Sequence, residues 1–198
     1  MEHRTRLSAS QRRAQLVEVA GRLFAERGYH TLSMEQLADA AGVSKPVFYQ
    51  HFPSKRDLYL ALLRDAVSEL DAQVRKALEG TSSNRERVRG AVSAYFDFVE
   101  DRNFRLLFDT AELREEDVRE TVHGALNEVT QAVAALIAAD AGLEPHAARF
   151  LAFGLRGLAL DGARWWAGQD QLTKDEAVQL LTQLAWRGLG SFDAGPAH

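Results

Sequence analysis

Apolar residues recur along this chain at intervals of three and four residues, and no segment alternates between apolar and polar residues as an amphipathic strand does. The first such stretch begins near Ser8 or Ser10 and stops at Gly28. Its apolar face consists of Leu16, Ala20, Leu23 and Phe24. A spacing of three and four residues places such side chains on one side of a helix. The pattern predicts an all-α protein.

Two short helices are predicted next, each with its own start and stop signals. Ser33 followed three residues later by Gln36 has the spacing of a capping box, and Gly42 ends this helix. Ser44 starts a second helix that ends near Phe52. The segment therefore reads as two helices joined by a tight turn.

Longer helices follow. One opens at Ser54 and runs to about Glu79, and a polar loop at 81–84 separates it from the rest. The last helix is expected to begin with a capping box of Thr173 and Glu176. The helices predicted beyond the loop span residues 85–100, 103–110, 116–140, 146–167 and 174–190. We expect three organisational parts: a three-helix unit at 1–54, a connecting helix at 55–79, and a larger helical domain at 80–198.

Composition narrows the class of protein. The 198 residues are 46% hydrophobic, enough to bury a sizeable core, and the absence of cysteine excludes disulfides and thiolate chemistry. The net charge of −4 is unevenly distributed, because residues 1–60 hold nine Lys/Arg against six Asp/Glu, and residues 61–198 hold fifteen against twenty-two. Arg4, Arg6, Arg12 and Arg13 contribute much of the positive charge. This asymmetry favours a nucleic-acid face near the N-terminus.

Several functional classes find no support in the sequence. There is no apolar run of membrane-spanning length and no signal-peptide core, so we expect a cytoplasmic protein without a membrane partner. No nucleophile motif, phosphate-binding glycine loop or metalloprotease motif occurs. We therefore expect no catalytic residues, no cofactor and no metal. His123 and Asn127 are four residues apart, but this pair alone is too little for a metal site.

The segment 33–52 carries the most specific chemistry. Gly42 suits a left-handed turn, and Val43 offers an apolar contact to the core. Phe48 and Phe52, four residues apart, face inward. The residues left facing outward are Lys45, Pro46, Val47, Tyr49, Gln50 and His51. Pro46 would be the second helical residue, so the Ser44 hydroxyl is expected to accept from the N–H of Val47. This spacing alone fits both a DNA-binding helix-turn-helix and an ordinary helical hairpin.

The whole segment resembles the DNA-binding region of the TetR family of transcriptional regulators. The resemblance covers roughly residues 10–60. Its landmarks, in order, are Gly28-Tyr29, Ser33, the Ala38 to Ser44 run, Tyr49, His51-Phe52 and Ser54-Lys55. It implies an N-terminal helix-turn-helix and a larger C-terminal domain for ligand sensing and dimerisation.

The resemblance also implies roles for single residues. Ser33, Tyr49, His51 and Lys55 would contact DNA phosphates, and Lys45, Pro46 and Val47 would face base edges, with Ser44 capping the helix that carries them. Gln50 would read a base or support its neighbours. Family members often have a small residue where Pro46 stands, and Val47 offers only methyl groups, for which a thymine methyl is the natural partner.

Beyond residue 80, the composition and spacing of the residues indicate a dimer interface and a ligand pocket. Glycines inside a predicted helix favour close approach of another helix, and family members dimerise through their last two helices, so a homodimer interface is expected at Gly154, Gly157, Gly162, Leu181 and Leu184. Glycines tolerated within one monomer core are the alternative. Candidate pocket residues are Tyr95, Phe96, Phe108, His123, Asn127, Thr130, Phe153, Trp165 and Trp166.

The resulting hypothesis is a regulator, of the repressor kind usual in the family. It would bind a palindromic double-stranded DNA operator as a homodimer and be released by a small, mostly apolar effector. Two other classes compete with it: an enzyme or small-molecule carrier without a DNA role, and a helical adaptor that binds proteins only.

Overall fold

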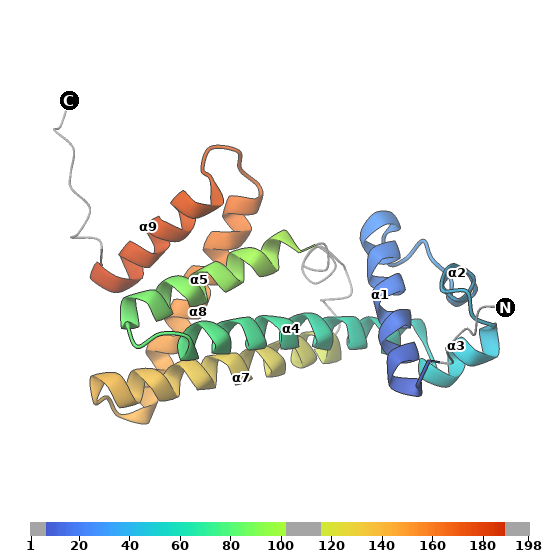
Figure 1. Cartoon of the computed structure of the whole chain (residues 1–198), viewed down its shortest axis with the longest axis horizontal. Helices are drawn as coiled ribbons and strands as arrows, with labels where there is room; N and C mark the ends of the chain where they lie inside the picture. Colours follow the sequence, from blue (N-terminus) through green and yellow to red (C-terminus); the bar gives the residue numbers. More distant parts are fainter. Residues whose placement is uncertain (1–6, 102–115, 189–198) are drawn as a thin grey trace. The chain divides into compact units, whose positions relative to one another are not determined.

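A computed structural model describes residues 7–101 and 116–188, and all regular structure within these ranges is α-helical (Figure 1). The helices are α1 (Ala9–Arg27), α2 (Met34–Ala40), α3 (Lys45–His51), α4 (Lys55–Glu79), α5 (Asn84–Glu100), α7 (Glu116–Ala141), α8 (Pro145–Ala167) and α9 (Lys174–Arg187). The predicted all-α class is confirmed. Arg4, Arg6 and the predicted helix at 103–110 lie outside the described residues. Of the helices described, none has the length and apolarity to span a membrane.

Local capping explains where several helices begin. The predicted capping boxes of Ser33 with Gln36 and of Thr173 with Glu176 are both formed, each by reciprocal side-chain and backbone hydrogen bonds. Ser8 caps α1 in the same way. These bonds satisfy backbone N–H groups that the first turn of a helix leaves without partners.

The chain divides into two compact units, and the division crosses α4 between Ala66 and Val67. Of the described residues, the first unit comprises 7–66 and 116–122, and the second comprises 67–101 and 123–188. In the first unit, each of α1 to α4 supplies a fully buried side chain to one core. These side chains are Leu16, Leu37, Phe48 and Leu58, each exposed by 1% or less. Apolar residues at helical spacing thus hold α1, α2, α3 and the start of α4 together.

In the second unit, α5 packs against both α8 and α9. Phe96 of α5, Ala163 of α8 and Val178 of α9 are buried at these contacts. Gly90 of α5 approaches α4 closely, since a Cβ atom placed on Gly90 would lie 2.7 Å from the Cβ of Ala77. The pairing of these two small residues sets the spacing between α4 and α5.

Gly90→Ala is expected to destabilise the protein by about 1–3 kcal/mol, because the new methyl group forces α4 and α5 apart. Gly124→Ala on α7 is the matched control, since nothing lies within 4 Å of a Cβ there. The control should gain up to about 1 kcal/mol from helix propensity alone. Denaturant unfolding of the two variants measures the difference, and equal effects would contradict the close approach.

Candidate nucleic-acid interface and effector cavity

The turn between α2 and α3 is closed by backbone hydrogen bonds at Gly42. Gly42 has φ +64°, the left-handed region predicted for it. Its N–H donates to Asp39 O at 3.1 Å, and the N–H of Val43 donates to Ala38 O at 3.1 Å. This is the Schellman arrangement, which satisfies the last carbonyls of a helix. The tight turn sets the placement of α3 relative to α2.

Ser44 departs from its predicted role. It is the residue before α3, and Pro46 is the second helical residue as expected, but the Ser44 hydroxyl makes no capping hydrogen bond. The expected bond to Val47 N–H is therefore absent. Pro46 removes one of the two N–H donors that an N-cap hydroxyl ordinarily uses, so the exposed hydroxyl remains on the surface.

The outward surface of α3 carries the side chains predicted to face DNA. Pro46, Gln50 and Tyr49 are exposed, and Val47 and His51 are half-buried. Phe48 and Phe52 are buried as predicted, with ring centroids 6.2 Å apart. Ser33 is exposed at the start of α2, where its hydroxyl oxygen accepts from the N–H of Gln36 at 3.2 Å. The predicted base-facing and phosphate-facing residues named here are thus exposed or half-buried.

Lys45 is the exception among these residues because its ammonium is paired with the carboxylate of Glu35 on α2. It also lies 5.8 Å from the centroid of the Tyr49 ring. The hydrogen bond from Lys45 is the main reason that the pKa of Glu35 falls to about 2. Sequence reasoning missed this pair, although an acidic residue in the first turn of α2 ten positions before Lys45 was visible.

Lys55 makes contacts that the sequence did not indicate. Its ammonium donates to Tyr29 O at 3.0 Å and Leu32 O at 2.9 Å, and it lies 4.3 Å from the centroid of the Tyr29 ring. The Tyr29 ring packs against Phe24 and Tyr59. Two of the three ammonium donors therefore hold the loop between α1 and α2, and the third is left for the expected phosphate contact. The Gly28-Tyr29 and Ser54-Lys55 landmarks of the family resemblance meet here.

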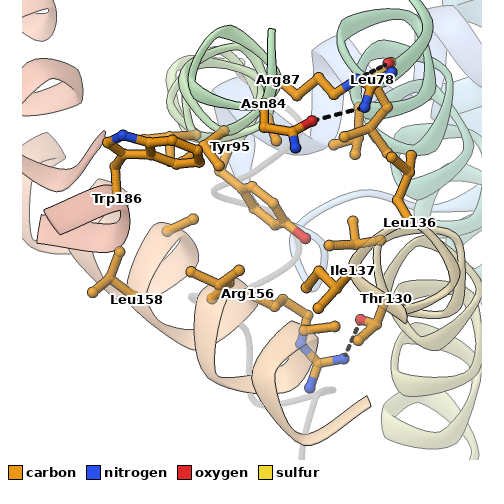
Figure 2. A pocket seen from close by; sticks show the side chains of 18 of the residues that line it. Leu78, Asn84, Arg87, Tyr95, Thr130, Leu136, Ile137, Arg156, Leu158 and Trp186 are labelled. Carbon is orange, nitrogen blue, oxygen red and sulfur yellow. Dashed lines mark hydrogen bonds between the residues drawn. The ribbon is translucent and has the colours of Figure 1, made fainter. Parts of the chain in front are cut away.

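The second unit contains a cavity of about 340 Å³ (Figure 2). Apolar side chains make most of its lining: Val74 and Leu78 from α4, Val88, Ala91 and Val92 from α5, Val133, Leu136 and Ile137 from α7, and Ala152, Leu155, Leu158 and Ala159 from α8. Trp186 of α9 also lines it. Small-molecule sites have this volume and this apolar character, with few polar groups.

The predicted pocket residues are only partly gathered at this cavity. Tyr95 and Thr130 line it. Phe96, His123, Asn127, Phe153, Trp165 and Trp166 are not among its lining residues, and Phe108 lies outside the described residues. Phe96 and Trp166 pack against each other with ring centroids 5.3 Å apart, and Trp165 is 60% exposed.

The polar groups of the cavity centre on Arg156 and Tyr95. Arg156 Nη1 donates to Thr130 Oγ1 and to Asn127 Oδ1, both at 3.2 Å, and its guanidinium stacks on Phe153. Within the described part of the chain, Arg156 has no carboxylate at ion-pair distance. Burial raises the pKa of Tyr95 to about 12, although the Arg156 charge opposes the shift. Tyr95 is therefore a protonated donor at neutral pH, beside an uncompensated cation.

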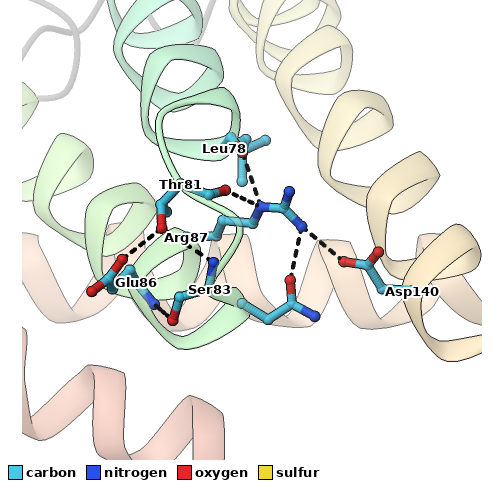
Figure 3. Close-up of polar contacts among 7 residues, drawn as sticks. Leu78, Thr81, Ser83, Glu86, Arg87 and Asp140 are labelled. Atoms are coloured by element: carbon cyan, nitrogen blue, oxygen red, sulfur yellow. Dashed lines mark hydrogen bonds and ion pairs between the residues drawn. The ribbon is translucent and has the colours of Figure 1, made fainter.

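Arg87 ties three helices together at one end of the cavity (Figure 3). Its Nε donates to Leu78 O and Thr81 O, at 3.0 and 2.9 Å. Its Nη1 donates to Asn84 Oδ1 at 2.8 Å and pairs with Asp140 Oδ2 at 3.1 Å. The C-terminal end of α4, the start of α5 and the end of α7 are thereby joined. No motif in the sequence indicated this role.

The predicted interface glycines of α8 fall into two groups. Nothing lies within 4 Å of a Cβ built on Gly154 or Gly157, and on the same helix Phe150 and Trp165 are 78% and 60% exposed. Gly162 differs, because a Cβ there would lie 2.5 Å from Leu181 Cδ1 of the same chain. Gly162 and Leu181 therefore pack α8 against α9 within the monomer, the alternative left open for the glycines. Leu184 is half-buried.

Among the described residues, no group of three His, Cys, Asp or Glu side chains is arranged to hold a metal ion.

Two segments of the chain match models of known protein families. Residues 16–62 match the bacterial regulatory proteins of the tetR family, and residues 73–196 match the tetracyclin repressor-like C-terminal domain. The chain belongs to the TetR family. Proteins of this family are DNA-binding transcriptional regulators rather than enzymes.

Known relatives extend along nearly the whole chain. The transcriptional activator FasR of Mycolicibacterium smegmatis is 46% identical over 187 residues, which cover 93% of this chain and 85% of FasR. A TetR-like regulator from Rhodococcus sp. RHA1 has a similar structure, with a TM-score of 0.70, 26% identity and coverage of 94% and 100% of the two chains. The regulator FadR of Bacillus subtilis, solved with stearoyl-CoA, has a TM-score of 0.70 at 20% identity and coverage of 89% and 98%, and shares the fold.

Proposed function

We propose that this TetR-family protein is a ligand-responsive regulator that binds a two-fold symmetric operator as a homodimer and changes its operator affinity when an amphipathic molecule enters the cavity of the second unit. The cavity is the observation on which the proposal rests, because a constitutive DNA-binding protein has no need of an unfilled apolar space. The helix-turn-helix supports the DNA-binding part, and the exposed face of α8 supports the dimer.

Different residues on the surface of α3 suit contacts to bases and contacts to phosphates. Val47 presents methyl groups, which suit a thymine methyl in the major groove, whereas the phenol of Tyr49 suits a phosphate. Val47→Ala is expected to change which base is preferred, by about 1–3 kcal/mol at one position of each half-site. Tyr49→Phe is expected to weaken binding to all sequences alike, by about tenfold or more, because a hydrogen bond to a charged group is lost.

Selection of binding sequences from a random duplex library measures both effects. The wild-type protein should enrich a palindrome whose half-sites lie about 34–36 Å apart, one turn of DNA. Enrichment of asymmetric sites, or identical base preferences for wild type and Val47→Ala, would contradict this part of the proposal.

The open glycine face of α8 supports the homodimer. Gly154 and Gly157 cost helix stability, and no described residue lies within 4 Å of a Cβ built at either position. A second copy approaching this face closely accounts for them. Leu180 is also exposed, on α9, which packs against α8.

The lining of the cavity supports an effector with a long apolar part and a polar or anionic head. An apolar chain suits the aliphatic walls, and Arg156 with Tyr95 offers a cation and a donor for the head. The stearoyl-CoA bound by the structurally similar FadR is a molecule of this kind. We expect Val74 and Leu78 to carry the signal, because they line the cavity and belong to α4, which continues toward the helix-turn-helix.

Whether the protein represses or activates transcription depends on the position of its operator relative to the promoter. The relative FasR is named an activator, so the repressor role expected from the family's usual behaviour competes with activation. A reporter assay with the selected operator placed upstream of, or overlapping, a promoter decides between them.

Titration with stearoyl-CoA and with free stearate tests the effector. Trp186 lines the cavity, so quenching of its fluorescence reports entry, and Trp186→Phe identifies the source of the signal. Operator affinity and ligand affinity must change by the same factor, because coupling is reciprocal. Ligands that fill the cavity without altering operator affinity would contradict the switching proposal.

A further inference from the structure

An ion pair in the helix-turn-helix neutralises a lysine on the proposed DNA-binding surface. Lys45 is the first residue of α3, on the surface that also carries Pro46, Tyr49 and Gln50. Its ammonium is nevertheless paired with Glu35, which lies in the first turn of α2. The side chains are 57% and 50% exposed, so the pair forms at the surface and no burial requires it.

A DNA-binding surface gains affinity from unpaired lysines, because each one that neutralises a phosphate releases condensed counterions. The pair removes this gain at Lys45. It also places a carboxylate, which repels phosphates, on the same surface. Helix dipole effects explain an acidic residue near the start of α2, but they do not explain why it reaches Lys45.

A paired lysine still has donors to offer. Its ammonium carries three N–H groups, and one carboxylate oxygen occupies one of them. A neutral base-edge acceptor, such as guanine O6 or N7, can take a remaining donor without displacing the carboxylate. A phosphate can approach only against the repulsion of Glu35. The pair therefore penalises phosphate binding and tolerates base reading.

We propose that Glu35 is a specificity-determining residue of the helix-turn-helix: by holding Lys45, it suppresses sequence-independent binding to the DNA backbone and leaves Lys45 to a base edge. The inference rests on the proposed DNA-binding function. Glu35 thereby lowers the affinity for non-operator DNA. This lower affinity matters because a genome offers a vast excess of non-operator sites that compete for the protein. The hydrogen bond with Lys45 lowers the pKa of Glu35 to about 2, so the carboxylate is ionised at neutral pH.

The test compares Glu35→Gln with Asp39→Asn. Both changes remove one negative charge from α2, but Asp39 is exposed and, within the described part of the chain, has no ion-pair partner. Each full-length variant is titrated with a random-sequence duplex and with a duplex enriched by the wild-type protein, over a range of salt concentrations. Thermal unfolding of both variants shows whether α2 remains folded.

Glu35→Gln is expected to raise affinity for the random duplex by up to about fivefold more than Asp39→Asn does, the upper limit for an exposed ion pair. The salt dependence of this binding should steepen by about one phosphate contact. Affinity for the enriched duplex should change less, so that the ratio of specific to non-specific affinity falls. Equal behaviour of the two variants would overturn the inference.

The same two substitutions in a Lys45→Gln variant show whether Glu35 acts through Lys45. In Lys45→Gln, the residue that Glu35 restrains is absent, so adding Glu35→Gln should raise affinity for the random duplex less than it does in the wild-type protein, because only the direct repulsion of phosphates by the carboxylate is then removed. An undiminished effect of Glu35→Gln in this background would show that the carboxylate acts without Lys45, contrary to the inference. If the wild-type protein enriches no duplex over random sequence, the proposed function fails, a result distinct from equal behaviour of the two α2 variants.

Discussion

Replacing Gly157 by glutamate is expected to yield a monomer that no longer binds the palindromic operator. At Gly157 on α8, no described residue lies within 4 Å of an added Cβ, so we expect the monomer to accept a side chain there. In a two-fold symmetric dimer the same patch faces itself, and each substitution acts twice. Two buried carboxylates without partners would oppose association strongly.

Loss of the dimer removes one of the two half-sites from each binding event. Because specific protein–DNA complexes have dissociation constants of about 10⁻⁸–10⁻¹¹ M, loss of half the contacts should weaken operator binding by at least about 100-fold. Analytical ultracentrifugation and operator titration measure the two consequences. Leu180→Asp on α9 should have the same effect, because Leu180 is 41% exposed.

Leu180 is a better test than the predicted interface residue Leu184, which is half-buried and would confound association with folding. Gly157→Ala separates size from charge, since its methyl group should weaken the dimer less than the glutamate does. If Gly157→Glu and Leu180→Asp both remain dimeric with intact operator binding, the interface lies on another surface.

Filling the cavity at Ala152 is expected to abolish the response to effector while operator binding persists. Ala152 is 1% exposed and lines the cavity, so the ring of Ala152→Phe occupies the space proposed for the acyl chain. Affinity for stearoyl-CoA should fall by at least about tenfold, since most contacts in such sites are apolar. Overpacking can cost about 1–3 kcal/mol, so thermal unfolding accompanies the titration.

Ala135→Phe is the control for this variant, because Ala135 is exposed on α7 and is not among the cavity-lining residues. It adds the same side chain without filling the cavity. Undiminished stearoyl-CoA binding by Ala152→Phe, together with an unchanged effect on the operator, would place the effector site elsewhere.

The elements that could be predicted are those whose determinants lie close together along the chain. The capping boxes at Ser33 and Thr173 and the left-handed Gly42 depend on residues only a few positions apart. The buried pair Phe48 and Phe52 follows from helical spacing. The Ser44 hydroxyl was predicted wrongly, because a side-chain rotamer at the surface is decided by competition with water.

Contacts between distant residues could not be read in this way. Lys55 is 26 residues from Tyr29, and Arg87 is 53 residues from Asp140. A lysine beside a helix start suits a phosphate and a loop carbonyl equally well, and only the packing of Tyr29 against Phe24 and Tyr59 brings the carbonyls within reach. The cavity lining shows the same limitation, since helical periodicity identifies inward faces but not where they fail to meet.

The sequence by itself determined the all-α class, the helix-turn-helix with its buried and outward faces, and the family, because hydrophobic period, caps and turn glycines act over a few residues. The tertiary structure decided which side chains face one another. It directed Lys55 inward, paired Lys45 with Glu35, and left space beside Gly157 while closing it at Gly162. The physical reason is that these outcomes depend on distances of a few ångströms between helices, and no local pattern encodes the relative placement of helices.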